Sequence, residues 1–426
     1  MILGVLFFSF IFFLLLGMPV AFAIGASSMA AIIVSGDSLI LASHYMFAGV
    51  NSFLLVAIPM FVLAGDIMLH SGMTKSLTNF ADIFVGRLHG GLGHTNIAAS
   101  VFFSGITGSA TADTTAIGSI MIPAMADKGY DRAYSTAITV ASSVIGPIIP
   151  PSITFVIYAL AVGNVSIGGL FIAGIVPGLL TSLGLMIMNH KISKARNYPK
   201  REFSYSKREI FDITRKSLVV LVMPLIIVFG VISGIYTATE AAAVAAGYAL
   251  VICLMTNKLR FKLIREIFYN SAKTSSIMFM LLATSSLLSY VLTTQGVPSL
   301  VADFIKSITD NPYVFLLIVN IALLLIGLVV DLFPAILIFG PILAPIAALY
   351  NIDPLHFGII FCVNLILGMN TPPVGSGLFI GSSIGHVPIE DLIREITPFI
   401  IMQGFVILII TYVPALTTLL PHAFGF

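Results

Sequence analysis

Charged residues are scarce in this chain of 426 amino acids, since Asp, Glu, Lys and Arg together make up only 9% of it. Soluble globular proteins carry about 25% charged residues. Hydrophobic residues make up 58% of the chain, and its mean hydropathy is +1.09. This composition excludes an ordinary water-soluble protein and indicates a chain that resides in a lipid bilayer.

Several other features are missing from the sequence. It has no tryptophan and only two cysteines, Cys253 and Cys362, both within apolar runs, which excludes a disulfide framework. No Gly-Lys dipeptide and no H-E-x-x-H occur, so the phosphate-binding loop of ATPases and a common zinc motif are absent. The net charge of +2 gives no nucleic-acid surface. We predict neither enzyme activity, nor an organic cofactor, nor a nucleic-acid partner.

Apolar segments long enough to cross a bilayer recur along the chain. The first, residues 2–34, is too long for a signal-peptide core, and we predict one retained helix bent near Pro19. Further spans are predicted at residues 45–70, 131–163, 166–190, 217–236, 238–256, 274–294, 354–384 and 397–420. Two amphipathic stretches, 76–88 and 297–308, are too short to cross and should lie along the membrane interface.

Two other apolar segments, residues 93–126 and 313–350, are interrupted in the middle. Gly, Ser and Thr crowd the first, while Gly327, Asp331 and Pro334 interrupt the second. Non-helical backbone at membrane depth is tolerated only where protein or a water-filled cavity surrounds it. We therefore predict two re-entrant helical hairpins, each of which enters and leaves on one side.

The basic residues orient these segments, because Lys and Arg concentrate in cytoplasmic loops. With a cytoplasmic N-terminus, 19 of the 20 basic residues lie inside and only Lys306 lies outside. The C-terminus then falls on the periplasmic side. A basic cytoplasmic loop, residues 191–216, divides the chain into halves of residues 1–190 and 217–426, with scaffold helices predicted at 1–70 and 217–294.

The two halves resemble each other at a constant offset of 222 residues. Without a gap, Pro123, Asp131, Gly146 and Pro150-Pro151 correspond to Pro345, Asp353, Gly368 and Pro372-Pro373. In the hairpins, Gly105 and Gly118 correspond to Gly327 and Gly340. Five predicted crossings separate the two copies, and an odd number inverts one copy relative to the other. Inverted repeats with broken helices are typical of secondary transporters.

Each half combines a hairpin tip with a helix break. The tips read F-F-S-G-I-T-G-S-A-T-A-D-T-T from Phe102 and G-L-V-V-D-L-F-P from Gly327, and the breaks read G-P-I-I-P-P-S from Gly146 and G-M-N-T-P-P-V-G from Gly368. Proline blocks helical hydrogen bonds and so frees carbonyl oxygens. Carbonyls and hydroxyls suit an alkali cation, and half-helix N-termini suit an anionic substrate.

Few carboxylates occur within the predicted spans, which favours sodium coupling over a proton relay. Asp331 and Asp113 are the main candidates for an ionisable site group. Asp113 and Glu240 have an alternative role as helix caps. The glycines at the tips have an alternative role in close helix packing.

The chain resembles a known family in four segments. These are the tip from Phe102, the G-Y-D-R-A at Gly129, the A-S-S-V-I-G-P-I-I-P-P-S-I from Ala141 and the second break. They resemble the large membrane subunit of tripartite ATP-independent periplasmic (TRAP) transporters over essentially the whole chain. The resemblance implies an elevator-type transporter of the bacterial inner membrane that imports organic acids with a sodium gradient. It also implies two partners: a separate small four-helix membrane subunit and a periplasmic substrate-binding protein.

The resemblance also implies site residues. Two or more Na⁺ ions would be held by Ser104, Gly105, Gly108, Ser109, Gly146, Ile149 and Ser152, and by Gly327, Val330, Asp331, Gly368, Thr371 and Val374. The substrate would lie between the breaks, near Thr107, Thr111, Asp113, Pro150, Pro151, Asn370, Pro372 and Pro373. The role of Asp331 stays open, as does the choice between sialic acid, which we favour, and a C4-dicarboxylate. A standalone sodium–dicarboxylate carrier and a non-transporting assembly subunit remain the alternatives.

Overall fold

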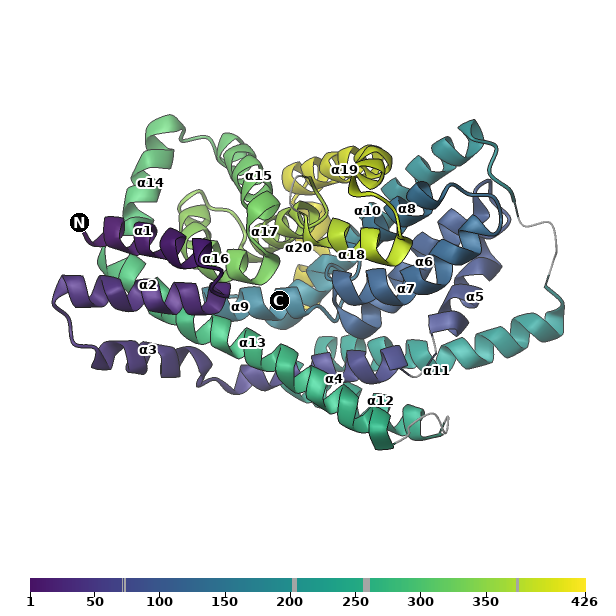
Figure 1. Cartoon of the computed structure of the whole chain (residues 1–426), viewed down its shortest axis with the longest axis horizontal. Helices are drawn as coiled ribbons and strands as arrows, with labels where there is room; N and C mark the ends of the chain where they lie inside the picture. Colours follow the sequence, from purple (N-terminus) through teal and green to yellow (C-terminus); the bar gives the residue numbers. More distant parts are fainter. Residues whose placement is uncertain (71, 73, 201–204, 256–260, 373–374) are drawn as a thin grey trace.

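The computed structural model describes the chain apart from residues 71, 73, 201–204, 256–260 and 373–374. Among the described residues every regular element is a helix (Figure 1). Eight helical segments there are long and apolar enough to cross a bilayer, judged by length and composition. The prediction of an all-α polytopic membrane protein is confirmed.

The first half contains ten α-helices and one short 3₁₀ helix in its described residues. Their bounds are α1 Ile2–Leu15, α2 Val20–Ser35, α3 Ile40–Val50, the 3₁₀ helix Phe53–Val56, α4 Ala57–His70, α5 Thr74–Val85, α6 Gly91–Thr107, α7 Ala110–Ala126, α8 Arg132–Ser143, α9 Ile153–Val162 and α10 Ile167–Ala195. Helices α6 and α7 form the first predicted hairpin, and α8 and α9 form the first broken helix.

The second half follows the same order. Its helices are α11 Lys207–Ile232, α12 Ala238–Met255, α13 Phe261–Thr294, α14 Val297–Ile308, α15 Pro312–Val329, α16 Leu332–Leu349, α17 Pro354–Gly368, α18 Ser376–Gly385, α19 Ile389–Tyr412 and α20 Ala415–Ala423. Helices α15 and α16 form the second hairpin, and α17 and α18 form the second broken helix. The amphipathic helices α5 and α14 occupy corresponding positions in the two halves.

Several segments differ from the prediction. The predicted span 45–70 is divided at Asn51 and Ser52, and the predicted span 397–420 is divided between α19 and α20. Residues 2–35 form two helices that lie side by side rather than one bent helix, because the chain turns between Leu15 and Val20, where Gly17 adopts φ +77° and Pro19 precedes the second helix (Figure 1). The predicted loop 191–216 is mostly helical: α10 continues to Ala195 and α11 begins at Lys207, capped by Ser206.

Both broken helices begin with an aspartate cap. The Asp131 carboxylate accepts a hydrogen bond from the Tyr134 N–H (3.0 Å), and the Asp353 carboxylate accepts from the Leu355 and His356 N–H groups (2.8 and 3.0 Å). A cap of this kind satisfies backbone donors at a helix start. The two aspartates are 222 residues apart, so the sequence repeat is a structural repeat at this point.

Packing between the halves shows the symmetry of the repeats. Helix α7 packs on α18 while α16 packs on α9, and α4 packs on α12 while α13 packs on α2. A Cβ built on Gly118 would lie 3.6 Å from Ile384, and one built on Gly340 would lie 3.6 Å from Val162. Adding 222 to the number of Gly118 gives Gly340, and subtracting 222 from that of Ile384 gives Val162. The second contact is therefore the symmetry equivalent of the first. Such exchange is the property of a pseudo-twofold axis.

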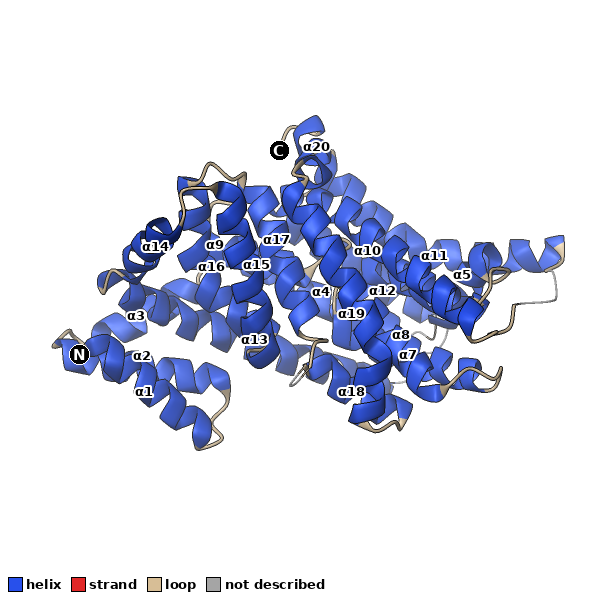
Figure 2. Cartoon of the chain, turned by 90° about the horizontal axis from the view of Figure 1, so that it is seen from above, coloured by secondary structure: helices blue, strands red, loops and turns tan. Residues whose placement is uncertain are grey.

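The two broken helices run in opposite directions. At the start of α8, Arg132 donates its Nε–H to the carbonyl of Gly385 at the end of α18 (2.7 Å). Further along, the ring of Tyr158 in α9, the second part of the first broken helix, lies 5.3 Å from the ring of Phe361 in α17, the first part of the second. The hairpins and broken helices form a core in the middle of the molecule, and α1–α4 and α11–α13 lie to one side of this core (Figures 1 and 2).

Candidate functional site

The first tip is a tight turn between α6 and α7. Gly108 has φ +58°, a left-handed conformation that glycine adopts without strain. Ser109 caps α7: its hydroxyl accepts from the Ala112 N–H (3.5 Å) and is hydrogen-bonded to the Thr111 hydroxyl (3.0 Å). The chain therefore reverses direction at the tip, and a new helix N-terminus begins there.

The first break separates α8 from α9 over residues 144–152. Ser152 caps α9 by accepting from the Phe155 N–H (3.2 Å), and its hydroxyl donates to the Pro147 carbonyl (2.5 Å). The peptide between Pro150 and Pro151 is cis. Ser152 thus fixes both ends of the loop that the prolines create.

The first tip lies against the first break, backbone to backbone. A Cβ built on Gly108 would lie 2.5 Å from the Pro151 carbonyl oxygen. A Cβ built on Gly146 would lie 3.2 Å from the Ser109 carbonyl oxygen and 3.1 Å from that of Ser143. These glycines therefore permit backbone carbonyls of the tip and of the break to lie closer than any side chain would allow.

The second tip and break are also in close contact. A Cβ built on Gly368 would lie 2.6 Å from the Cα of Gly327, so α15 and the end of α17 touch through their backbones. Val330 ends α15, and Asp331 stands at the N-cap of α16 without a side-chain capping bond. The Thr371 hydroxyl donates to the Leu367 carbonyl (2.9 Å). Pro373 and Val374 lie outside the described residues.

A cavity of about 230 Å³ lies where both tips and both breaks meet. It is lined by Gly108, Ser109, Ala110, Thr111, Pro147, Thr154, Asp331, Leu332, Phe333, Met369 and Ser376. Helices α7, α9, α16 and α18 each contribute residues of their first turn. Since a helix N-terminus carries a partial positive charge, four such ends make this cavity attractive to an anion.

The cavity also lies on the pseudo-twofold axis. Five lining positions of the first half, Ser109, Ala110, Thr111, Pro147 and Thr154, have their counterparts 222 residues later at Asp331, Leu332, Phe333, Met369 and Ser376. A site between inverted repeats is the location expected of a substrate site in a secondary transporter.

Four predicted site residues line this cavity: Gly108, Ser109, Thr111 and Asp331. Other predicted residues lie around it without lining it. Asn370 is buried, and its side-chain amide donates to the Val140 carbonyl on α8 (2.7 Å), which ties the second break to the first broken helix. Ile149 lies in the first break, beside Gly178 of α10.

Three predicted residues of hairpin α6–α7 face the protein interior. The Ser104 hydroxyl donates to the Val101 carbonyl (2.6 Å), and Gly105 packs against Pro224 of α11. Thr107 is buried beside Gly65 of α4.

Asp113 is fully buried one turn into α7 and does not line the cavity. Ser109 caps α7, and no capping hydrogen bond of the Asp113 carboxylate is present among the described residues. Glu240 is different, because its carboxylate accepts from the Thr237 N–H (2.8 Å) and caps α12. The alternative role as a helix cap therefore holds for Glu240.

Sequence reasoning missed seven residues that line the cavity: Ala110, Pro147, Thr154, Leu332, Phe333, Met369 and Ser376. Thr154 is 1% exposed and its hydroxyl has no hydrogen-bond partner among the described residues. Both hydroxyl residues, Thr154 and Ser376, follow a proline pair by three positions. A hydroxyl residue three positions after a proline pair, in the first turn of the following half-helix, was therefore the sequence signal that could have identified them.

The fold and the cavity define a class: a polytopic membrane transport protein built from two inverted sets of hairpin and broken helix. Residues 7–416 match the family described as tripartite ATP-independent periplasmic transporter, DctM component. This chain belongs to that family.

Similar proteins cover the whole chain. It is 37% identical to the sialic acid TRAP transporter large permease protein SiaM of Vibrio cholerae, over 98% of both chains. It is 36% identical to the C4-dicarboxylate TRAP transporter large permease protein DctM of Pseudomonas aeruginosa, over 94% of this chain and 93% of that one. The solved structure of the YdaH transporter of Alcanivorax borkumensis has the same fold, with a TM-score of 0.58 at 13% identity and 86% coverage of each chain.

Proposed function

We propose that this chain is the transport subunit of a sodium-coupled secondary transporter that imports an organic anion by an elevator mechanism. The observation that carries the proposal is the cavity on the pseudo-twofold axis, into which four half-helices direct their N-termini. Among the described residues that line it there is no Lys, Arg or His. Helix dipoles and hydroxyl groups are therefore the features that would bind the anion.

The Asp331 carboxylate supports sodium coupling. It lines the same cavity and makes no capping bond, so its negative charge would repel an anionic substrate unless a cation stood beside it. The carbonyl oxygens between the tips and the breaks, such as those of Ser109, Ser143 and Pro151, are suitable ligands for such cations. Bound sodium would thus favour binding of the substrate, which is the coupling that symport needs.

The contacts around the core support an elevator movement. The moving unit would be the two hairpins with the two broken helices, and the scaffold would be α1–α4 with α11–α13. Small side chains lie at this boundary: a Cβ on Gly65 would lie 3.3 Å from the Cα of Thr107, and Gly105 meets Pro224. Small residues let helices approach closely with few interlocking side chains.

The names of the relatives and the helix N-termini at the cavity support an organic anion as the substrate class. Relatives are named for sialic acid, C4-dicarboxylates, 2,3-diketo-L-gulonate and isethionate, which are all organic anions. We favour sialic acid, with C4-dicarboxylates second. The partners would be a small membrane subunit and a periplasmic substrate-binding protein.

We propose that the basic side of the protein faces the cytoplasm of a bacterial inner membrane, with the C-terminus in the periplasm. The expected cytoplasmic N-terminus rests on a single crossing by residues 2–34. Because α1 and α2 form two helices that turn back on each other, the same positive-inside rule now favours a periplasmic N-terminus. Labelling of a cysteine introduced at position 2 in intact cells tests this orientation.

The function is tested in proteoliposomes that contain the chain, its small membrane subunit and its binding protein. Substrate should accumulate only when an inward sodium gradient is imposed, and equal uptake in sodium-free buffer would refute the coupling. Omitting the binding protein separates the alternatives, because a standalone carrier should transport without it. No uptake of any organic anion with all components present would favour the assembly subunit.

A further inference from the structure

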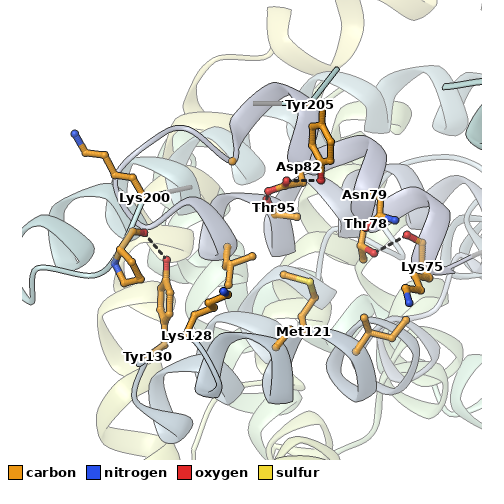
Figure 3. A pocket seen from close by; sticks show the side chains of 15 residues that line it. Lys75, Thr78, Asn79, Asp82, Thr95, Met121, Lys128, Tyr130, Lys200 and Tyr205 are labelled. Atoms are coloured by element: carbon orange, nitrogen blue, oxygen red, sulfur yellow. Dashed lines mark hydrogen bonds between the residues drawn. The ribbon is translucent and has the colours of Figure 1, made fainter. Parts of the chain in front are cut away.

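A second cavity, of about 530 Å³, lies away from the transport site. It is bounded by α5, by the base of hairpin α6–α7 and by residues that precede α11 (Figure 3). Three of its lining residues are Lys75, Lys128 and Lys200, which come from these three separate regions. We name this cavity the basic pocket.

The three lysines carry a surplus of positive charge into the basic pocket. All three are exposed, and among the residues that the structure describes none of them forms an ion pair. In the view of Figure 3, Lys75 and Lys200 lie on opposite sides, with Lys128 between them. Lysine side chains are long and flexible, so three that line one cavity attract an anion placed in it.

One carboxylate, that of Asp82, also faces the basic pocket. It accepts hydrogen bonds from the Thr95 hydroxyl (3.0 Å) and the Tyr205 hydroxyl (2.9 Å), as Figure 3 shows. These bonds join α5, α6 and the segment before α11. Asp82 is therefore held in a structural role, and among the described lining residues the lysines outnumber the carboxylates by two.

The remaining lining of the basic pocket is largely apolar. Leu92, Ile120 and Met121 contribute to it. Next to it on α5, Phe84 is 65% exposed, and Leu88 just beyond the helix is 45% exposed, so this side of the protein is one that lipid would cover. A free anion in water gains nothing from apolar walls, whereas a lipid uses both its charged headgroup and its acyl chains.

We propose that the basic pocket binds the headgroup of an anionic phospholipid from the leaflet on the basic side of the membrane. The phosphate would lie among the three lysines, with the acyl chains along Leu92, Met121 and the exposed face of α5. The lipid would thereby bridge α5, the hairpin base and the segment before α11. This inference concerns lipid binding alone and does not depend on the transported substrate.

Lipid retention by the purified full-length chain tests the inference. Native mass spectrometry in detergent would titrate phosphatidylglycerol, with zwitterionic phosphatidylethanolamine as the comparison lipid. A basic residue near an anionic lipid surface contributes about fivefold in affinity. The variant Lys75→Gln/Lys128→Gln/Lys200→Gln should therefore bind phosphatidylglycerol about a hundredfold more weakly, and Lys→Arg at the same three positions should bind it as the unaltered chain does.

The matched control removes three exposed lysines on the same side that do not line the basic pocket: Lys191→Gln/Lys194→Gln/Lys207→Gln. It should retain phosphatidylglycerol. Equal weakening in both triple variants would show a general surface-charge effect and overturn the inference. Displacement of the lipid by millimolar inorganic phosphate would overturn it too, because the site would then be one for a free anion.

Discussion

Replacement of Gly368 by alanine perturbs the second tip-and-break pair with one methyl group. The new Cβ would lie 2.6 Å from the Gly327 Cα, 2.8 Å from its carbonyl carbon and 3.1 Å from its oxygen. Carbon atoms in contact prefer about 3.5–4.0 Å, so α15 and α17 must separate by about 1 Å. The atoms in the way belong to backbone, which has no rotamer that could relieve the clash.

Overpacking of this kind costs about 1–3 kcal/mol. If that cost falls on the state that binds sodium, the apparent sodium affinity drops by about 5- to 150-fold, at about 1.4 kcal/mol per tenfold. The tip residues Asp331 and Leu332 and the break residue Met369 would move apart in the cavity. The sodium concentration that gives half-maximal uptake should therefore rise strongly. The maximal uptake at saturating sodium should change less.

The assay is sodium-dependent uptake in proteoliposomes, with thermal unfolding measured on the same preparation. The matched control is Gly247→Ala, a glycine in α12 whose added Cβ meets nothing within 4 Å. Alanine there should raise helix stability by about 0.5–1 kcal/mol and leave the sodium dependence unchanged. An unaltered sodium dependence in Gly368→Ala would refute the reasoning, as would an equal loss in Gly247→Ala.

Three further predictions follow from the geometry. Asn370→Ala removes the amide that donates to the Val140 carbonyl. That carbonyl still accepts from the Ser143 hydroxyl, so the lost hydrogen bond should lower the free energy of unfolding by about 0.5–1.5 kcal/mol, measured by chemical denaturation. Asp331→Asn should abolish the sodium dependence of substrate binding, measured by calorimetry with and without sodium, whereas Asp303→Asn on α14 should keep it. Arg196→Ala breaks a partly exposed ion pair with Glu395 (2.9 Å) and should change the free energy of unfolding by less than about 1 kcal/mol; a larger loss would show that this link between the halves is structural.

Much of the fold was predictable because a membrane helix is recognised from a local run of apolar residues. The hairpins predicted at 93–126 and 313–350 are helices 91–126 and 312–349 with a turn in the middle. Amphipathic α5 and α14 also lie within two or three residues of their predicted bounds. Hydropathy cannot tell one bent helix from two, however, so residues 2–35 were misassigned: a turn at Gly17 and Pro19 reverses the chain instead of bending it.

The candidate site was predictable only in part. Repeated glycines and prolines located both tips and both breaks, because a break in a membrane helix needs those residue types. They did not show that Thr154 and Ser376 line the cavity while Asp113 is enclosed in the hairpin. Which side of a half-helix faces the cavity depends on how it packs against the other half, and no local pattern records that.

By itself, the sequence determined the membrane environment, the inverted repeat and the position of each break, since these depend on composition and on residues close in the chain. The tertiary structure alone decided that four helix N-termini meet in one cavity on the pseudo-twofold axis. It also decided that Lys75, Lys128 and Lys200 share a pocket. Both arrangements join residues far apart in the sequence, and only the packing of one half against the other, or of α5 against the hairpin, brings them together.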